Sequence, residues 1–126
     1  MRQGRAKPKD VVRSLVEAYN AKSVEGVLGL YAEDALFWDP LHRDCVQGRA
    51  AIAEVVRSLF AAFPDEEMSI VTLAGDDHHA VAEVRSSGTS PRSGERFELE
   101  FTEIYEVKDG RIVSCRVYLD PEELPA

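Results

Sequence analysis

The chain has 126 residues, is 44% hydrophobic and 30% charged, and carries a net charge of −8 from 15 basic and 23 acidic residues. This size and balance predict a single soluble globular domain, and the negative charge argues against nucleic acid and anionic membranes as partners. No apolar run approaches the roughly 18 residues that a membrane helix needs. Cys45 and Cys115 lie far apart without C-x-x-C spacing, which indicates reduced thiols in a cytoplasmic protein.

The first nine residues differ in charge from the rest of the chain. They hold four bases, Arg2, Arg5, Lys7 and Lys9, and no acid, but they form no apolar face and are too few for a targeting segment. We therefore predict a flexible basic leader at residues 1–9, one domain at residues 10–120 and a C-terminal tail at residues 121–126.

Apolar residues at helical spacing predict three helices in the first half of the chain. The first helix begins near Asp10, and its apolar stripe consists of Val12, Leu15, Val16 and Tyr19. The second covers residues 24–31 behind a candidate N-cap at Ser23, and the third covers residues 52–63 up to Pro64. Between the second and third helices, Ala35–Asp39 is predicted as a strand that Pro40 stops, followed by a loop at residues 41–48.

The second half of the chain alternates with period two and predicts four strands. The predicted strands are Met68–Leu73, Ala80–Arg85, Arg96–Val107 and Arg111–Leu119. Asp109-Gly110 indicates a hairpin turn between the last two, and residues 86–95 are predicted as a turn-rich connection. Helices followed by a mostly antiparallel sheet predict an α+β fold, in which one curved sheet and three helices enclose an apolar pocket.

One carboxylate interrupts the apolar face of the penultimate strand. Its odd positions are all apolar from Phe97 to Val107 except Glu103, and an unpaired buried carboxylate is costly. In an apolar pocket Glu103 would have a raised pKa and could donate a hydrogen bond as a neutral acid. Alternatively it meets an arginine or a cluster of amides and is structural, or a bulge turns it to water.

A second carboxylate, Asp39, ends the predicted strand at residues 35–39. Asp before Pro is common in plain turns, but Asp39 and Glu103 on elements that face one cavity could act as a base and a neutral donor. The alternative is two unrelated acids. His42 could relay protons beside Asp39, or it is a solvent-exposed loop histidine.

The alternation of side chains along a strand also predicts the face of the sheet on which the neighbouring side chains lie. Phe37 shares the face of Asp39, so Trp38 is expected to pack outside, at a dimer contact for example, and Arg116 to face solvent or a partner subunit. In the last strand, the odd positions from Val113 to Leu119 are expected on the buried face. The run Asp76-Asp77-His78-His79 is predicted as a polar surface turn and not as a metal site, because adjacent residues diverge in a strand.

The chain resembles the nuclear-transport-factor-2-like superfamily, and most closely its SnoaL-like proteins and ketosteroid isomerases. The resemblance rests on five segments in the same order along nearly the whole chain: Tyr19-Asn20-Ala21, residues 30–35 (LYAEDA), Asp39-Pro40, residues 48–52 (GRAAI) and residues 109–113 (DGRIV). It implies a cone-shaped curved sheet wrapped around three N-terminal helices, with a hydrophobic pocket, and homodimers that pair through the convex sheet face. The fold hosts isomerases, cyclases, hydrolases and binding modules.

The resemblance also implies roles for individual residues. Asp39 falls at the position of the isomerase's catalytic base, and Glu103 at that of the protonated acid of its oxyanion hole. The hole's tyrosine would fall at Leu15, and Tyr19, one turn further on, could replace it or pack in the core. The catalytic aspartate of the cyclases falls at Val117, which lowers the expectation of cyclase or epoxide hydrolase activity.

We therefore expect an isomerase-like proton transfer next to a carbonyl of a small hydrophobic compound, with Asp39 and Glu103 as the catalytic residues and with no cofactor or metal. The alternative is a non-catalytic module of the same fold that binds a hydrophobic ligand or serves as a dimeric interaction module. The side chains expected to line the substrate site are Tyr19, Phe37, Phe60, Phe101, Tyr105 and Val117.

Overall fold

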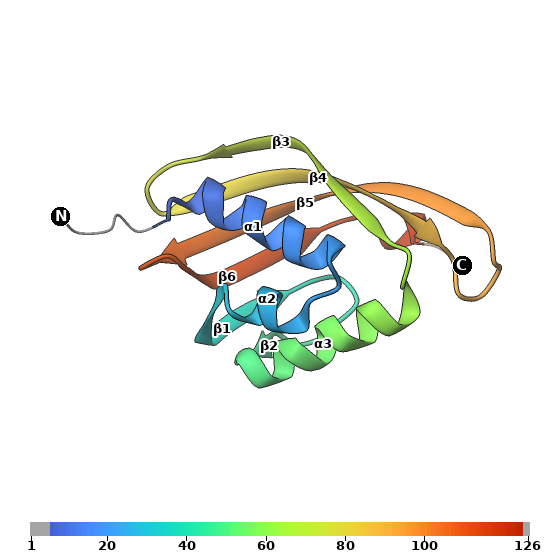
Figure 1. Ribbon diagram of the computed structural model, residues 1–126, viewed down its shortest axis with the longest axis horizontal. Helices are drawn as coiled ribbons and strands as arrows, with labels where there is room; N and C mark the ends of the chain where they lie inside the picture. Colours follow the sequence, from blue (N-terminus) through green and yellow to red (C-terminus); the bar gives the residue numbers. More distant parts are fainter. Residues whose placement is uncertain (1–5, 125–126) are drawn as a thin grey trace.

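A computed structural model describes residues 6–124, and these residues form three α-helices and six β-strands. Figure 1 shows their arrangement. The elements are α1 (Pro8–Asn20), α2 (Val24–Leu28), β1 (Tyr31–Trp38), β2 (Val46–Gln47), α3 (Arg49–Ala62), β3 (Glu67–Gly75), β4 (His79–Thr89), β5 (Arg96–Lys108), β6 (Arg111–Tyr118) and a 3₁₀ helix at Pro121–Glu123.

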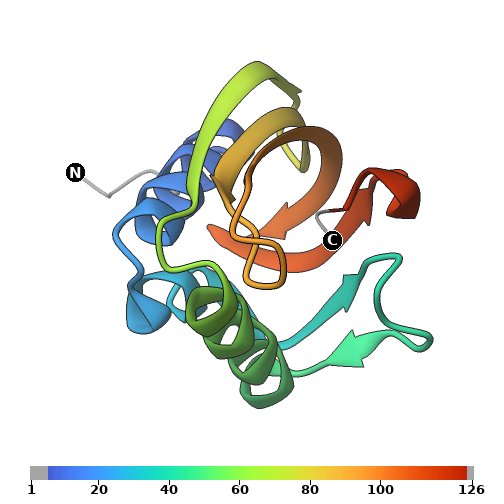
Figure 2. The same cartoon turned by 90° about the vertical axis from the view of Figure 1, so that its right-hand side faces the viewer.

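The strands of the described chain make one six-stranded sheet in the order β2-β1-β6-β5-β4-β3. β1 and β6 run parallel, whereas the other neighbouring strands run antiparallel. The sheet curls strongly without closing, and α1 and α3 cover its concave side (Figure 2). The predicted α+β class with a curved, mixed sheet around three helices is confirmed.

The helices follow their predicted apolar stripes. α1 buries Val11, Val12, Leu15 and Val16 against the sheet. It begins at Pro8, two residues before the predicted start, because proline has no N–H to leave unsatisfied in the first turn. At α2 the Ser23 hydroxyl accepts a hydrogen bond from the Gly26 N–H at 2.9 Å, which confirms the predicted N-cap.

Two boundaries in the first half differ from the predictions. Tyr31 opens β1 and does not end the second helix; it is 1% exposed, and the Ile112 N–H donates to the carbonyl of Leu30 beside it. A single buried aromatic fits the last turn of a helix and the first residue of a strand equally well. The predicted loop at residues 41–48 contains β2, which pairs Val46 with Phe37.

The second half also departs from the predicted boundaries. β4 continues to Thr89 through residues predicted as a turn, and it pairs Ser86 with Leu99 and Gly88 with Phe97. Between β5 and β6 a register shift after Glu106 pairs Val107 with Ile112, so Ile112 is buried although strict alternation placed it outside.

Secondary structure reaches close to both ends of the described residues. Pro8 and Lys9 belong to α1, whereas residues 1–5 lie outside the described residues. At the other end, the Asp120 carboxylate accepts from the Glu122 N–H at 2.9 Å and starts the 3₁₀ helix. Leu124 then reaches back to the cavity described below. Within residues 6–124 no helix has both the length and the apolar character to cross a membrane.

Candidate active site

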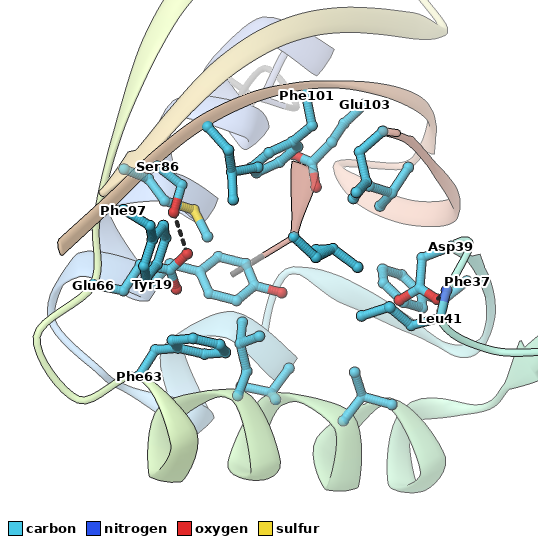
Figure 3. Close-up of a pocket in the computed structure, with 18 residues that line it drawn as sticks. Tyr19, Phe37, Asp39, Leu41, Phe63, Glu66, Ser86, Phe97, Phe101 and Glu103 are labelled. Carbon is cyan, nitrogen blue, oxygen red and sulfur yellow. Dashed lines mark hydrogen bonds between the residues drawn. The ribbon is translucent and has the colours of Figure 1, made fainter. Parts of the chain in front are cut away.

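A cavity of about 320 Å³ lies between the concave face of the sheet and the helices. Figure 3 shows the side chains around it. Most of the lining is apolar, as a site for a small hydrophobic molecule requires, and it includes Phe37, Phe63, Phe97, Phe101, Val117 and Leu124. The polar side chains that reach the cavity are Tyr19, Asp39, Glu66, Ser86 and Glu103.

Glu103 reaches the cavity from β5, as the alternation of that strand predicts. The hydroxyl of Tyr105 donates a hydrogen bond to its Oε1 atom. Burial and, to a smaller extent, the negative charge of Glu66 raise the pKa of Glu103 to about 7, against the opposing effect of this hydrogen bond. In the described chain no arginine pairs with Glu103, and the bulge of β5 comes only after Glu106. Of the three alternatives for this residue, the structure therefore shows the pocket.

Tyr105 lies behind Glu103 and not on the cavity wall. It is fully buried on the inner face of β5, and burial raises its pKa well above the usual value, so the phenol remains a hydrogen-bond donor. We therefore correct its expected role as a lining residue. Its hydroxyl holds the carboxyl group of Glu103 in one orientation, with Oε2 left for the cavity.

Asp39 stands just after β1, at the end of the cavity toward Leu41 (Figure 3). Its Oδ1 atom accepts hydrogen bonds from the backbone N–H groups of Leu41 and His42, each at 2.9 Å. The same oxygen atom lies 2.8 Å from Nδ1 of His42. Only 9% of the Asp39 side chain is exposed, against 38% for His42. These contacts fix the carboxylate in place, and Oδ2 receives no hydrogen bond from residues 6–124.

Tyr19 points its hydroxyl into the middle of the cavity from the last turn of α1 (Figure 3). Burial and the nearby Glu103 raise its pKa well above the usual value, so the group is a neutral donor. No other side chain in the described part of the chain makes a hydrogen bond to this hydroxyl. Leu15, one turn earlier, is 1% exposed and packs in the core.

Phe60 supports Tyr19 from behind and is not part of the lining. The two rings meet edge to face with centroids 5.8 Å apart, and the ammonium of Lys22 lies 5.7 Å from the centre of the Phe60 ring. The expectation that Phe60 lines the substrate site is therefore corrected, whereas Tyr19, Phe37, Phe101 and Val117 do line the cavity.

Glu66 and Ser86 form a polar pair in the cavity that the sequence analysis missed. Glu66 is 9% exposed and Ser86 is 1% exposed, and the Ser86 hydroxyl donates to Oε2 of Glu66. Burial raises the pKa of Glu66, partly offset by that hydrogen bond and by Lys22. The acidic run after Pro64 looks like a solvated turn, but the alternation Ala80, Ala82, Val84 extends to Ser86 and marks it as inward.

Trp38, Arg116 and the run of acids and histidines at residues 76–79, which the sequence analysis singled out, do not line the cavity. Trp38 packs outside, as parity predicts, with the guanidinium of Arg116 5.2 Å from its ring centre. The carboxylate of Asp76 accepts hydrogen bonds from the backbone N–H groups of His78 and His79, each at 2.8 Å. These hydrogen bonds stabilise the turn between β3 and β4. Among residues 6–124, no three His, Cys, Asp or Glu side chains gather as metal ligands would.

The cavity thus brings together the fixed carboxyl group of Asp39, the carboxyl group of Glu103 with its pKa raised to about 7, and the phenol of Tyr19 in apolar surroundings. A carboxylate with one oxygen atom unoccupied can accept a proton, and two neutral O–H groups can stabilise an oxygen atom that gains negative charge. The low polarity of the walls strengthens both interactions.

Comparison with known proteins agrees with this architecture. The family described as "SnoaL-like domain" matches residues 12–115. A curated relative named "Steroid Delta-isomerase", from Nocardioides simplex, is 31% identical over 121 residues, which cover 94% of each chain.

Solved structures share the fold at lower sequence identity. One is SalBIII, an epoxide hydrolase/cyclase-like enzyme with a role in pyran ring formation in the polyether salinomycin. It superposes with a TM-score of 0.82, at 20% sequence identity and 94% coverage of both chains. A second is a nuclear-transport-factor-2-like protein of unknown function from Burkholderia pseudomallei. Its TM-score is 0.81, at 18% sequence identity and 90% coverage of both chains.

Proposed function

This chain belongs to the SnoaL-like family, and we propose that it catalyses an isomerase-type proton transfer next to a carbonyl of a small hydrophobic compound, using its own side chains. The observation that carries the proposal is that Asp39, Tyr19 and Glu103 line one cavity whose other walls are largely apolar. The substrate class that we propose is a β,γ-unsaturated ketone, in which the carbon between the carbonyl and the double bond carries an acidic proton.

In the proposed reaction, Asp39 removes that proton through Oδ2, and the electron pair moves into the carbonyl to give a dienolate. Glu103 and Tyr19 donate hydrogen bonds to the enolate oxygen as its negative charge develops. Asp39 then returns the proton to the far carbon of the former double bond, and the product is the conjugated ketone. Proton and electrons balance, and the enzyme ends in its starting state.

Tyr105 serves this reaction without touching substrate. Its hydrogen bond to Oε1 leaves the proton of the neutral Glu103 on Oε2, on the side of the cavity. A donor that is already oriented needs no rearrangement when the enolate forms, which is the main advantage of an oxyanion hole.

Tyr19 compensates in this scheme for the leucine at position 15. A missing donor typically costs an oxyanion hole about 10²–10³ in rate. Tyr19 lies one helical turn beyond Leu15, and its hydroxyl ends in the cavity, so the second donor comes from the same helix. The likeness to the Steroid Delta-isomerase supports steroidal ketones as the first substrates to try.

The test is the turnover of a steroidal and of a monocyclic β,γ-unsaturated ketone, followed by the absorbance of the conjugated product. Asp39→Asn should lower kcat at least about 10²-fold, as expected for the loss of a general base. Asp44→Asn is the matched control, because it makes the same chemical change at an exposed position of the same loop and should leave the rate unchanged.

Two results would overturn the proposal. One is a folded wild-type protein that shows no turnover above buffer, and the other is an Asp39→Asn variant that retains the full rate. Binding of the same ketones without turnover would favour the alternative of a non-catalytic module that holds a hydrophobic ligand.

A further inference from the structure

The cavity has a second polar end that the proposed reaction does not use. In Figure 3, Glu66 and Ser86 lie at the opposite side of the cavity from Asp39, with Tyr19 between them. Ser86 comes from β4, and Glu66 directly precedes β3, so two adjacent elements hold the pair. The proton-transfer residues come instead from α1, β5 and the end of β1.

Glu66 is more than a satisfied structural acid. Its Oε2 atom accepts the hydrogen bond from Ser86, whereas Oε1 has no hydrogen-bond partner among residues 6–124. The residue is 9% exposed and lines the cavity. Among the described residues, the only side-chain nitrogen or oxygen atom that is fully buried without a hydrogen-bond partner is Nε of Arg49, so Oε1 of Glu66 is in contact with the space of the cavity. The free oxygen is therefore available to a ligand.

The pairing of the strands sets the separation of the two polar ends. Ser86 pairs with Leu99 on β5, and Glu103 lies four residues further along the same strand. At about 3.3 Å per residue, the two positions are about 13 Å apart along the sheet. A ligand that reaches both ends must therefore have an elongated skeleton, and the walls between them require it to be apolar.

We propose that Glu66 and Ser86 bind a hydroxyl group at the end of the substrate remote from the reacting carbonyl, an inference that rests on the proposed function for its orientation. The substrate class is then an elongated, apolar, unsaturated ketone with an alcohol or phenol at its other end. A hydroxyl both donates and accepts, so it pairs with Glu66 whether the acid is ionised or neutral.

An ammonium group fits this end less well than a hydroxyl. The Lys22 ammonium already lies beside Glu66, where it donates to the backbone carbonyl of that residue, and it would repel a second cation. Transfer of an ammonium into an apolar cavity is also far more costly than transfer of a hydroxyl.

The test compares the affinities of testosterone and its analogue without the remote hydroxyl, both measured by isothermal titration calorimetry. These conjugated ketones bind without turning over. The wild-type protein should bind testosterone at least about tenfold more tightly, the range of one hydrogen bond to a charged group. In Glu66→Met the ratio of the two affinities should fall to about one.

Three variants keep the outcome interpretable. Glu67→Met, the same change at the exposed neighbour, should preserve the wild-type ratio. Glu66→Gln, which keeps the volume and a partner for Ser86, should lower the ratio at least threefold and serves if Glu66→Met does not fold. Asp39→Asn should lose turnover and keep the ratio, which separates this proposal from the proposed function.

Two results would overturn the proposal of a hydroxyl site. One is a wild-type protein that binds testosterone and the analogue without the remote hydroxyl equally well, and the other is a ratio of the two affinities that stays unchanged in both Glu66 variants. A normal ratio in a protein with no turnover would leave the hydroxyl site standing and refute only the proposed reaction.

Discussion

Replacing Glu103 by glutamine should make the protein more stable at neutral and alkaline pH. The substitution keeps the volume of the side chain and an oxygen that can accept from Tyr105, but it removes the ionisable group from the cavity. Because burial raises the pKa of Glu103 from the ordinary value of 4.5 to about 7, the folded state holds this proton more tightly than the unfolded state.

The sign and size of the effect follow from that difference in pKa. Between pH 4.5 and 7 the unfolded chain releases the proton while the folded protein retains it, so the free energy of unfolding decreases as pH rises. Below pH 4.5 the free energy of unfolding has not yet decreased, because both states keep the proton. Above pH 7 the decrease is complete, because both states have released it. Because one pKa unit corresponds to about 1.4 kcal/mol, a rise in the pKa from 4.5 to about 7 amounts to about 3 kcal/mol.

Urea unfolding of both proteins at several pH values from 4 to 8.5 measures this contribution. The difference in unfolding free energy between Glu103→Gln and wild type should increase by about 3 kcal/mol across this range, with the change centred between pH 4.5 and 7. Titrating groups that do not interact with Glu103 act equally in both proteins and cancel in the difference, whereas the charge of Glu66 contributes through its effect on the pKa of Glu103. A difference that does not depend on pH would refute the conclusion that Glu103 is a desolvated acid.

Three further substitutions test contacts of the site and its frame. Tyr105→Phe removes the hydrogen bond that lowers the pKa of Glu103, so the loss of turnover with rising pH, expected near pH 7 in wild type, should move to higher pH; an unmoved inflection would contradict this. Tyr19→Phe should lower kcat about 10²–10³-fold if its hydroxyl is the second oxyanion donor, with a circular dichroism spectrum like that of wild type as the control. Asn20→Ala loses hydrogen bonds of 2.9 and 2.8 Å to the backbone of Met68 and should reduce the unfolding free energy by about 1–2 kcal/mol in urea, whereas an unchanged midpoint would show that water replaces both bonds.

The sequence alone specified most of the secondary structure and the family. Helical and alternating patterns are local, because a helix or strand must place its apolar residues on one face wherever it packs. For that reason the inward direction of Glu103, the outward direction of Trp38 and the N-cap at Ser23 could be inferred from neighbours in the chain. The family resemblance is confirmed by the SnoaL-like match over residues 12–115. The homodimer stays a prediction.

Boundaries that depend on a partner strand were less accessible. Val46–Gln47 becomes a strand only because β1 lies beside it, and β4 extends through Ser86 because β5 continues the ladder there. Neither segment has a strong intrinsic preference for a strand, so the pairing decides its conformation.

The composition of the cavity was decided by the tertiary structure. Tyr105 and Phe60 have the periodicity of lining residues, yet curvature of the sheet and the position of α1 put them behind Glu103 and Tyr19. Glu66 enters the cavity from a run of charges typical of a surface turn, held there by Ser86, which lies 20 positions away in the sequence. Periodicity fixes the face on which a side chain lies, but whether that face meets a cavity or another layer of side chains depends on how the whole sheet curls.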